Sequence, residues 1–256
     1  MNEETFIEFW LRDATQILVR YLVIAGSAFI LFYILFKNTL WFRKIQKKLP
    51  KLKDYKRDII YSFISISIFA TIALFVFYYL LPYTNIYFNF DEYGTTYYIL
   101  SWVWMFFLHD TYFYWMHRLM HHPKLYRKVH LIHHKSTNPS PWTAYAFHPF
   151  EAFLEALIAP LIAFTLPVHI SSFGLFFLFQ IIYNVYGHLG FELYPKKFHK
   201  TSIGKWINTS VAHNLHHKRF NGNYGLYFLF WDRIMGTIRD DYDTTFENTT
   251  SNKNNN

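Results

Sequence analysis

Nine of the 14 histidines are clustered at spacings that suit metal binding. His117 and His121 are four residues apart, so on a helix their side chains lie on one face, one turn apart. Two HxxHH patterns follow, beginning at His130 and at His213. In each, one helical turn can bring three imidazoles together, and the adjacent pair can serve two metals. With His188, which follows an apolar segment, the predicted metal ligands are His117, His121, His130, His133, His134, His188, His213, His216 and His217.

An isolated histidine more often serves packing than metal binding. His148, near a predicted membrane edge, is kept as an additional candidate ligand. His109 lies about 12 Å along a helix from His117 and is expected to line a substrate path or to form hydrogen bonds in the bundle. His169 falls in a predicted turn on the opposite side and is set aside. His199 is also isolated, so it is a weak candidate for a metal ligand.

Two polar residues precede His117 on the same helical stripe. Asp110 and Tyr114 lie seven and three residues before it. A carboxylate in this position can accept the N–H of a ligand imidazole and fix its tautomer, the usual supporting role in metal sites. We therefore predict that Asp110 and Tyr114 are catalytic residues that support the metal site.

The ligand types narrow the choice of metal. The sequence contains no cysteine, so thiolate ligands, disulfides and cysteine nucleophiles are excluded. One zinc ion takes roughly three or four protein ligands, and nine imidazoles exceed that number. They suit two metal ions with open coordination positions. Imidazole binds iron, copper, zinc and nickel alike, and the Glu-x-x-His motifs of soluble di-iron bundles are absent. Open positions beside a membrane-buried substrate fit oxygen activation, which favours two iron ions.

Long apolar helices must position these histidines. Of the 256 residues, 52% are hydrophobic, 23% aromatic and only 16% charged, which indicates a surface that faces lipid. Segments 17–36, 59–81 and 97–115 are each long enough to cross a bilayer, and segments 149–166 and 171–186 form a predicted helical hairpin. The predicted fold class is all-α: a polytopic membrane helical bundle of four to five apolar segments with a histidine-rich cytosolic cap.

The basic residues predict the orientation. Eight of the 25 lysines and arginines lie between residues 43 and 57, between two apolar segments, as in a cytoplasmic loop. With that loop inside, every histidine cluster falls on the cytoplasmic side of a bacterial inner membrane or of the endoplasmic reticulum. The same concentration of charge argues against a nucleic-acid partner, despite a formal net charge of +8.

Three regions are predicted along the chain. Residues 1–95 form an N-terminal membrane anchor with two spans, and residues 96–240 form the catalytic domain. Residues 241–256 are rich in Asn and Thr, a composition that predicts a disordered tail. The sequence contains no internal repeat and no glycine-rich phosphate loop.

Three segments resemble the fatty acid hydroxylase/sterol desaturase superfamily: YWMHRLMHH, HLIHHKSTNPSPWTAYAFHPFE and AHNLHHKRFNGNYGLYFLFWDRIMGT. The order HxxxH, HxxHH, His, HxxHH is that family's signature, and the resemblance covers about residues 108–237. The AFHPFE and WDRIMGT runs are most similar to the sterol C-5 desaturase branch.

The resemblance implies a bundle of four-helix type, a di-iron centre bound by the nine histidines, and the use of O2 with two electrons. One position departs from the family pattern: fatty acid hydroxylases carry a His pair where this chain has Asn184 and His188. Asn184 is therefore expected either to contact the metal through water or to leave the site one ligand short. A fused haem domain is absent, so electrons would come from a separate haem or iron–sulfur protein and ultimately from NAD(P)H.

The predicted function is hydroxylation or desaturation of a membrane lipid, whether sterol-like, fatty acyl or carotenoid. The alternative is a histidine-rich membrane protein that binds or transports metal without oxygenase activity, or that senses lipid or pH. A transporter needs polar ligands near the middle of the membrane, a description that only His109 and Asp110 approach. A membrane zinc protease would carry H-E-x-x-H, which is missing.

Overall fold

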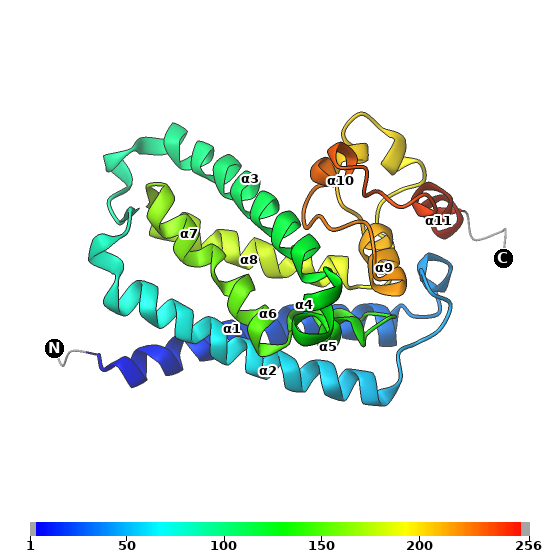
Figure 1. Ribbon diagram of the computed structural model, residues 1–256, viewed down its shortest axis with the longest axis horizontal. Helices are drawn as coiled ribbons and strands as arrows, with labels where there is room; N and C mark the ends of the chain where they lie inside the picture. The colour runs from blue at the N-terminus through cyan, green and yellow to red at the C-terminus, as the bar shows by residue number, and fades with distance from the viewer. Residues whose placement is uncertain (1–3, 252–256) are drawn as a thin grey trace.

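Helices form almost all of the regular structure in residues 4–251, which the computed structural model describes (Figure 1). The long helices are α1 (Phe6–Phe29), α2 (Leu52–Leu74), α3 (Gly94–Met120) and α8 (Ile170–Gly187). π-Helical turns, Ile30–Leu35 and Phe75–Tyr79, extend the first two. The shorter helices are α4 (Pro123–Val129), α5 (Leu131–His134), α6 (Pro149–Ala156), α7 (Ile158–Thr165), α9 (Ser210–Arg219), α10 (Phe230–Ile234) and α11 (Tyr242–Thr250). The mostly helical fold that the apolar segments predict is confirmed.

In the part of the chain that the structure describes, three helices are long and apolar enough to cross a membrane: Phe6–Leu35, Leu52–Tyr79 and Ile170–Gly187. The first two begin before the predicted apolar segments. Each has a carboxylate in its first turn, Glu8 or Asp54, that accepts the backbone N–H of the residue preceding the helix. Such a cap satisfies an otherwise unpaired donor and extends the helix into polar sequence.

Two predicted spans are not among these three. α3 contains all of segment 97–115, but tyrosines, tryptophans, His109 and Asp110 make it less apolar than an aliphatic span. Segment 149–166 is divided into α6 and α7 at Leu157. Pro160 has no N–H to bond the carbonyl four residues earlier, which interrupts the helix there. The number of membrane segments beyond three stays a prediction.

The long helices pack around α8. α1 lies along α2, both α1 and α3 contact α8, and α6 lies against α2 (Figure 1). Tyr21 and Ile66 are buried between α1, α2 and α8, while Met105 and Phe176 are buried between α3 and α8. Large apolar side chains stay exposed along α1, α2 and α3, as lipid-facing surfaces require.

The connections fall at two ends of the bundle. At one end, β1 (Ile86–Tyr87), which follows α2, pairs in parallel with β2 (Val168–His169), which precedes α8. At the other end lie the connection between α1 and α2 and the helices that follow α8 (Figure 1). This end carries the histidine clusters of α5 and α9.

The predicted disordered tail is partly wrong. Residues 242–250 form α11, and Tyr242 and Phe246 are fully buried against α9, beside Val211 and Leu215. These two aromatic rings are four residues apart, so they form one apolar stripe on an otherwise polar helix. The Asn/Thr-rich composition concealed that stripe. Residues 252–256 of the predicted tail lie outside the described residues.

Candidate metal centre

All nine predicted histidines come together in two groups. The five-histidine group is His117, His121, His130, His134 and His216; the four-histidine group is His133, His188, His213 and His217. Within each group the candidate ligand nitrogens all lie within 4.8 Å of one another. The end of α3, the short helix α5, the end of α8 and helix α9 therefore converge on two neighbouring centres.

Each HxxHH pattern divides its adjacent histidines between the two groups. His133 and His217 belong to the four-histidine group, and His134 and His216 to the five-histidine group. Consecutive side chains of a helix point about 100° apart, so one turn can reach two centres. The grouping follows the division that the spacing predicts, and the binding of metal itself stays a prediction.

The Nε2 atoms within each group face one another at short range. Nε2 of His130 lies 3.1 Å from that of His117 and 3.0 Å from that of His134. Nε2 of His188 lies 2.9 to 3.2 Å from those of His133, His213 and His217. Two nitrogens bound at right angles to one metal ion, each at about 2.1 Å, are about 3.0 Å apart. The spacing therefore fits neighbouring ligands of a metal.

Hydrogen bonds on the opposite ring nitrogen leave these Nε2 atoms free. Four Nδ1–H groups donate to backbone carbonyls at 2.8 to 3.1 Å: His117 to Tyr224, His188 to Asn184, His216 to Gly222 and His217 to Ser136. A neutral imidazole has one N–H, so Nε2 then carries a lone pair. Lone pairs that face one another repel, and a shared cation removes that repulsion. The donor set fits two bound metal ions.

A carboxylate supports His130 in the same way. Glu151 Oε1 lies 2.6 Å from His130 Nδ1, and the two side chains are 1% and 2% exposed. A carboxylate that accepts from a ligand imidazole fixes the ring and increases its basicity. Glu151, within the AFHPFE run, was not singled out from the sequence. Its signal was an acidic residue inside an apolar segment, which in a membrane protein marks a functional position.

Asp110, predicted to fill that role, does not contact a histidine. Its Oδ1 accepts the backbone N–H groups of Tyr227 and Phe228 at 2.8 and 3.1 Å. The carboxylate thus holds the segment that follows Tyr224, whose carbonyl accepts from His117. The predicted contact with a ligand imidazole is wrong, because the side chain of Asp110 faces this later segment of the chain.

Tyr114 and Asn184 also lie outside the two groups. The Tyr114 hydroxyl is 3.0 Å from Thr237 Oγ1. Asn184 donates its side-chain amide to the Ala144 carbonyl at 2.8 Å, and its own carbonyl accepts from His188. Asn184 therefore orients a candidate ligand through its backbone, while its side chain holds the Ala144 carbonyl.

The isolated histidines stay outside both groups as well. His148 caps α6, where its Nδ1 accepts the Phe150 N–H at 3.3 Å, and it does not join the candidate ligands. His109 lines a cavity, and its Nδ1 lies 3.0 Å from the Tyr227 hydroxyl, a hydrogen bond within the bundle. His169 contacts the Phe88 carbonyl at the opposite end.

Burial keeps the candidate ligands neutral. It lowers the pKa of His117 and of His188 to about 4, and it holds the pKa of His130 and of His213 well below the usual 6.5. Neutral imidazole is the form that binds metal, so the folded protein presents both groups ready for ions at neutral pH.

We expect the metal-free protein to lose stability as pH falls from about 6.5 toward about 4. In that window the unfolded chain binds protons at these histidines, whereas the folded chain does not, so acid favours unfolding. Above the window both states are neutral and these groups add no pH dependence. Thermal unfolding in detergent at a series of pH values measures the effect. His169→Ala should leave the dependence unchanged, and a flat midpoint would contradict the expectation.

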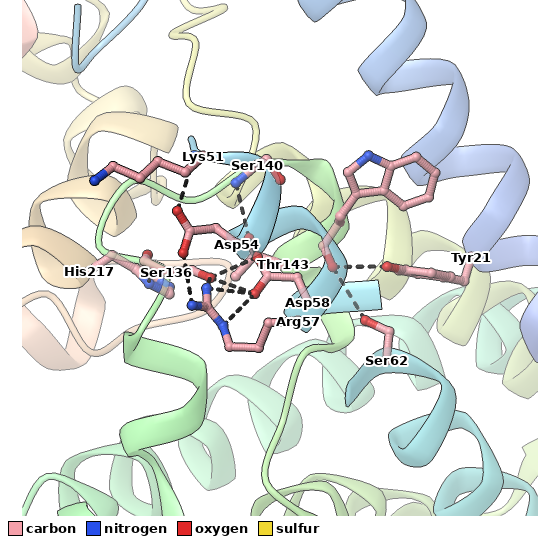
Figure 2. Close-up of polar contacts among 11 residues, drawn as sticks. Tyr21, Lys51, Asp54, Arg57, Asp58, Ser62, Ser136, Ser140, Thr143 and His217 are labelled. Carbon is pink, nitrogen blue, oxygen red and sulfur yellow. Dashed lines mark hydrogen bonds and ion pairs between the residues drawn. The ribbon is translucent and has the colours of Figure 1, made fainter. Parts of the chain in front are cut away.

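A second buried carboxylate supports the four-histidine group from α2 (Figure 2). Asp58 is 2% exposed, and its oxygens accept the hydroxyls of Ser136 and Thr143 at 2.7 Å. Arg57 pairs with Asp58 at 3.0 Å. The carbonyl of Ser136 in turn accepts from His217. α2 thus holds the loop after the first HxxHH pattern, and through it a candidate ligand, a role that the apolar pattern of α2 did not predict.

The basic segment 43–57 also packs on this end of the bundle and does not stand free as a loop. Lys44 is fully buried; its Nζ donates to the Gly190 carbonyl at 3.2 Å and to Asn138 Oδ1 at 3.4 Å. Burial lowers the pKa of Lys44 to about 7. Gln46 donates to the Thr137 carbonyl at 2.7 Å. The N-terminal region therefore helps to build the site.

A cavity of about 300 Å³ lies between α1, α2, α6, α7 and α8, with His109 of α3 also in its wall. Phe147 forms part of its wall, and the Phe147 ring lies 5.0 Å from that of His133. Ile170, at the first turn of α8, also lines it, about 27 Å along the helix axis from His188. The walls are mostly apolar, so the cavity suits the body of a lipid.

The fold and the site define a class of protein: it is mostly helical, with three candidate membrane spans within residues 4–251 and two histidine groups that could each hold a metal ion. Residues 102–237, just over half of the chain, match the model of the fatty acid hydroxylase family. The chain belongs to this family, and the relatives it matches place it in the sterol desaturase-like branch.

Three relatives illustrate the similarity. A Delta(7)-sterol 5(6)-desaturase of Gibberella zeae is 33% identical over 158 residues, which cover 60% of this chain and 46% of the relative. A Delta(7)-sterol 5(6)-desaturase of Leptosphaeria maculans is 35% identical over 138 residues (54% and 36%), and a lathosterol oxidase of Rattus norvegicus is 35% identical over 147 residues (57% and 47%). The chain thus spans about half the length of these relatives or less. No solved structure matches significantly.

Proposed function

We propose that the protein is a membrane-bound di-iron oxidoreductase that uses O2 and two electrons to hydroxylate or desaturate a lipid. The observation that carries the proposal is the pair of buried histidine groups, which divide both HxxHH patterns between them. Membership of the fatty acid hydroxylase family supports the chemistry, and relatives named as sterol desaturases and a lathosterol oxidase support a lipid substrate.

Each histidine group would hold one iron ion. Bound there, the pair would supply the activation of O2, which protein side chains alone cannot perform. The chain's own part is to present neutral Nε2 atoms, to fix the rings through their Nδ1–H groups, and to strengthen His130 through Glu151. The cavity beside Phe147 would hold the reacting carbon near the four-histidine group and away from water.

The balance of atoms requires an electron donor. Hydroxylation places one oxygen atom of O2 in a C–H bond and releases the other as water, consuming two electrons and two protons. Desaturation removes one hydrogen from each of two adjacent carbons and releases both oxygen atoms as water, with the same two electrons and two protons. We assign the electrons to a separate haem or iron–sulfur protein, reduced ultimately by NAD(P)H.

An open groove beside the five-histidine group is where such a donor would approach. Trp115, Leu119 and Arg118 line it together with His121, a candidate ligand. Exposed Lys124, Arg127, Lys128, Lys218 and Arg219 belong to the same end of the molecule, and their charge suits an acidic partner. We place this end in the cytoplasm, as the basic segment 43–57 predicts, in a bacterial inner membrane or the endoplasmic reticulum.

The proposed division of labour follows the predicted regions. Residues 1–95 anchor the chain in the membrane and help to wall the cavity, while residues 96–240 carry all nine candidate ligands. The two regions differ in their proposed roles but pack as one unit, because contacts such as that of Asp58 with Ser136 cross the boundary near residue 95.

Lipid analysis of cells that express the wild-type chain or His216→Ala tests the function. A lipid that has gained one oxygen atom or lost two hydrogen atoms should accumulate only with the wild type. In cells supplied with isotopically labelled O2, a hydroxylated product should carry the label. A folded, iron-loaded wild-type chain that changes no lipid would contradict the proposal and favour a metal-binding or transport protein.

A further inference from the structure

The ring of Tyr224 packs on the five-histidine group beside the open groove. Its centroid lies 5.3 Å from that of His121, 5.5 Å from that of His216 and 5.6 Å from that of His117. Tyr224 and His121 also line the groove. A side chain that can lose an electron therefore contacts three candidate ligands at once.

Three further aromatic rings continue from Tyr224 to the protein surface. The Tyr114 ring lies 6.2 Å from that of Tyr224, and it stacks on the Trp231 ring at 6.1 Å. The Trp115 ring lies 5.3 Å from that of Tyr114 and 5.7 Å from that of Trp231. These distances join ring centroids and are typical of aromatic rings in contact. Trp115 is 44% exposed and lines the groove, so the series of four rings ends at the surface.

Hydrogen bonds at Tyr114 provide a path for its proton. The Tyr114 hydroxyl lies 3.0 Å from Thr237 Oγ1, which itself donates to Asp232 Oδ1 at 2.6 Å. Arg118 donates to the same phenol oxygen at 3.3 Å, which leaves the phenol proton for Thr237. A phenol loses an electron readily only if its proton leaves at the same time. The Tyr114 proton can pass to Thr237 while Thr237 passes its own to the carboxylate, and both can return.

Packing alone is the ordinary role of aromatic rings, and 23% of this chain is aromatic. Tyr126 illustrates that role on the same histidine group. Its ring lies 5.4 Å from that of His121 and 5.8 Å from that of His134, and it contacts Phe220 at 6.3 Å on its other side. Phenylalanine is much harder to oxidise than tyrosine or tryptophan. The rings beyond Tyr224 differ from this contact, because every one of them can be oxidised.

We propose that the series of four rings is a redox relay, which supplies electrons to the five-histidine group when no lipid occupies the cavity. The inference rests on the proposed function, in which the donor's two electrons reduce O2 only halfway to water. A bound lipid gives the remaining two electrons from its C–H bonds. In the absence of lipid, the relay gives them one at a time, and the oxygen is released as water.

The tryptophans at the outer end of the relay balance this reaction. Trp115 and Trp231 each give up one electron and the indole proton, and these two electrons and two protons complete the reduction to water. Tyr114 and Tyr224 pass the electrons inward and return to their original state. A one-electron reductant at the groove, such as the proposed donor protein, then restores the tryptophans. The relay thereby removes oxidising equivalents before they attack the ligand imidazoles.

Peroxide treatment of the iron-loaded full chain, purified in detergent without a lipid substrate, tests the relay. Hydrogen peroxide is the probe because it brings two oxidising equivalents and needs no electron donor. Peptide mass spectrometry then locates the side chains that gain oxygen. In the wild type we expect this oxygen on Trp115 and Trp231, above the level in iron-free protein given the same peroxide, and not on the candidate ligands.

The variants locate the path. Tyr114→Phe keeps the ring but removes the oxidisable hydroxyl, so it should lower tryptophan oxidation to the iron-free level and move the added oxygen to the histidines that Tyr224 contacts. Tyr126→Phe is the matched control and should behave as wild type. Trp115→Phe, at an exposed position, is a second variant that does not depend on the buried hydrogen bonds. It should also raise histidine oxidation.

Three results would each overturn the relay: oxygen on the ligand histidines of the wild type in place of the tryptophans, a wild-type pattern in both Tyr114→Phe and Trp115→Phe, or the same change in Tyr126→Phe. Iron content and lipid oxidation, measured on the same proteins, separate the two proposals. Any of these results in iron-loaded protein that oxidises a lipid would remove the relay alone. The expected oxidation pattern in iron-loaded protein that changes no lipid would remove the proposed function alone, and a chain that binds no iron would remove both.

Discussion

Glu151→Gln should weaken metal binding by the five-histidine group about 10- to 100-fold, the usual effect of losing a carboxylate behind a ligand imidazole. Glu151 Oε1 is 2.6 Å from His130 Nδ1, and His130 belongs to the five-histidine group alone. Glutamine fills the same volume, so the buried site stays packed, but its neutral oxygen polarises the ring less. One of two bound irons should therefore become easy to remove.

Iron retained after dialysis against graded concentrations of a chelator measures this effect. His148→Ala provides the matched control, because His148 caps the same helix and lies outside both histidine groups. Wild-type retention in Glu151→Gln, or an equal loss in His148→Ala, would show that the carboxylate does not support a metal ligand.

Asp58→Asn should destabilise the protein by about 2 to 4 kcal/mol, because two buried hydrogen bonds to a charged acceptor are weakened. Ser136 and Thr143 both donate to Asp58 at 2.7 Å, and the Ser136 carbonyl positions His217 (Figure 2). The four-histidine group should lose iron in preference to the five-histidine group. Asp58→Asn should therefore affect mainly the four-histidine group, whereas Glu151→Gln should affect mainly the five-histidine group.

Asp54→Asn is the control for this variant. Asp54 pairs with the same arginine, Arg57, at 2.9 Å, but it lies in the first turn of α2 and contacts neither Ser136 nor Thr143. Thermal unfolding in detergent, with iron content before heating, should separate the two variants clearly. Equal unfolding midpoints for both would mean that the buried carboxylate holds no essential contact.

Local spacing predicted how the histidines divide into two groups. HxxHH places three imidazoles on one turn and divides the adjacent pair, and this depends only on helix geometry. His188 was found because it directly follows an apolar helix. His169, which the same reasoning sets aside, lies in β2 at the opposite end of the bundle.

The supporting residues were less predictable because they reach the site across the fold. Glu151 meets His130 from 21 residues away, and Asp58 meets Ser136 from 78 residues away. No periodicity in the sequence records such pairs. Asp110 lies on the helical stripe of His117, but the segment after Tyr224 packs over it, and its carboxylate accepts the Tyr227 N–H instead. Tertiary packing decided both outcomes.

The helices show the same limit. Apolar length located α1, α2 and α8, whereas the break at Leu157 depended on one proline and the helix α11 on two aromatic rings. Composition averages over such single residues. Position-specific features therefore account for most differences between prediction and structure.

Iron content of the full chain, purified in detergent from iron-replete cells, tests the central claim most directly. We expect about two irons per chain in the wild type, one for each histidine group. His133→Ala and His216→Ala change different groups and should each lower the iron content. No iron, or a single zinc unaffected by either substitution, would contradict a di-iron centre at these histidines.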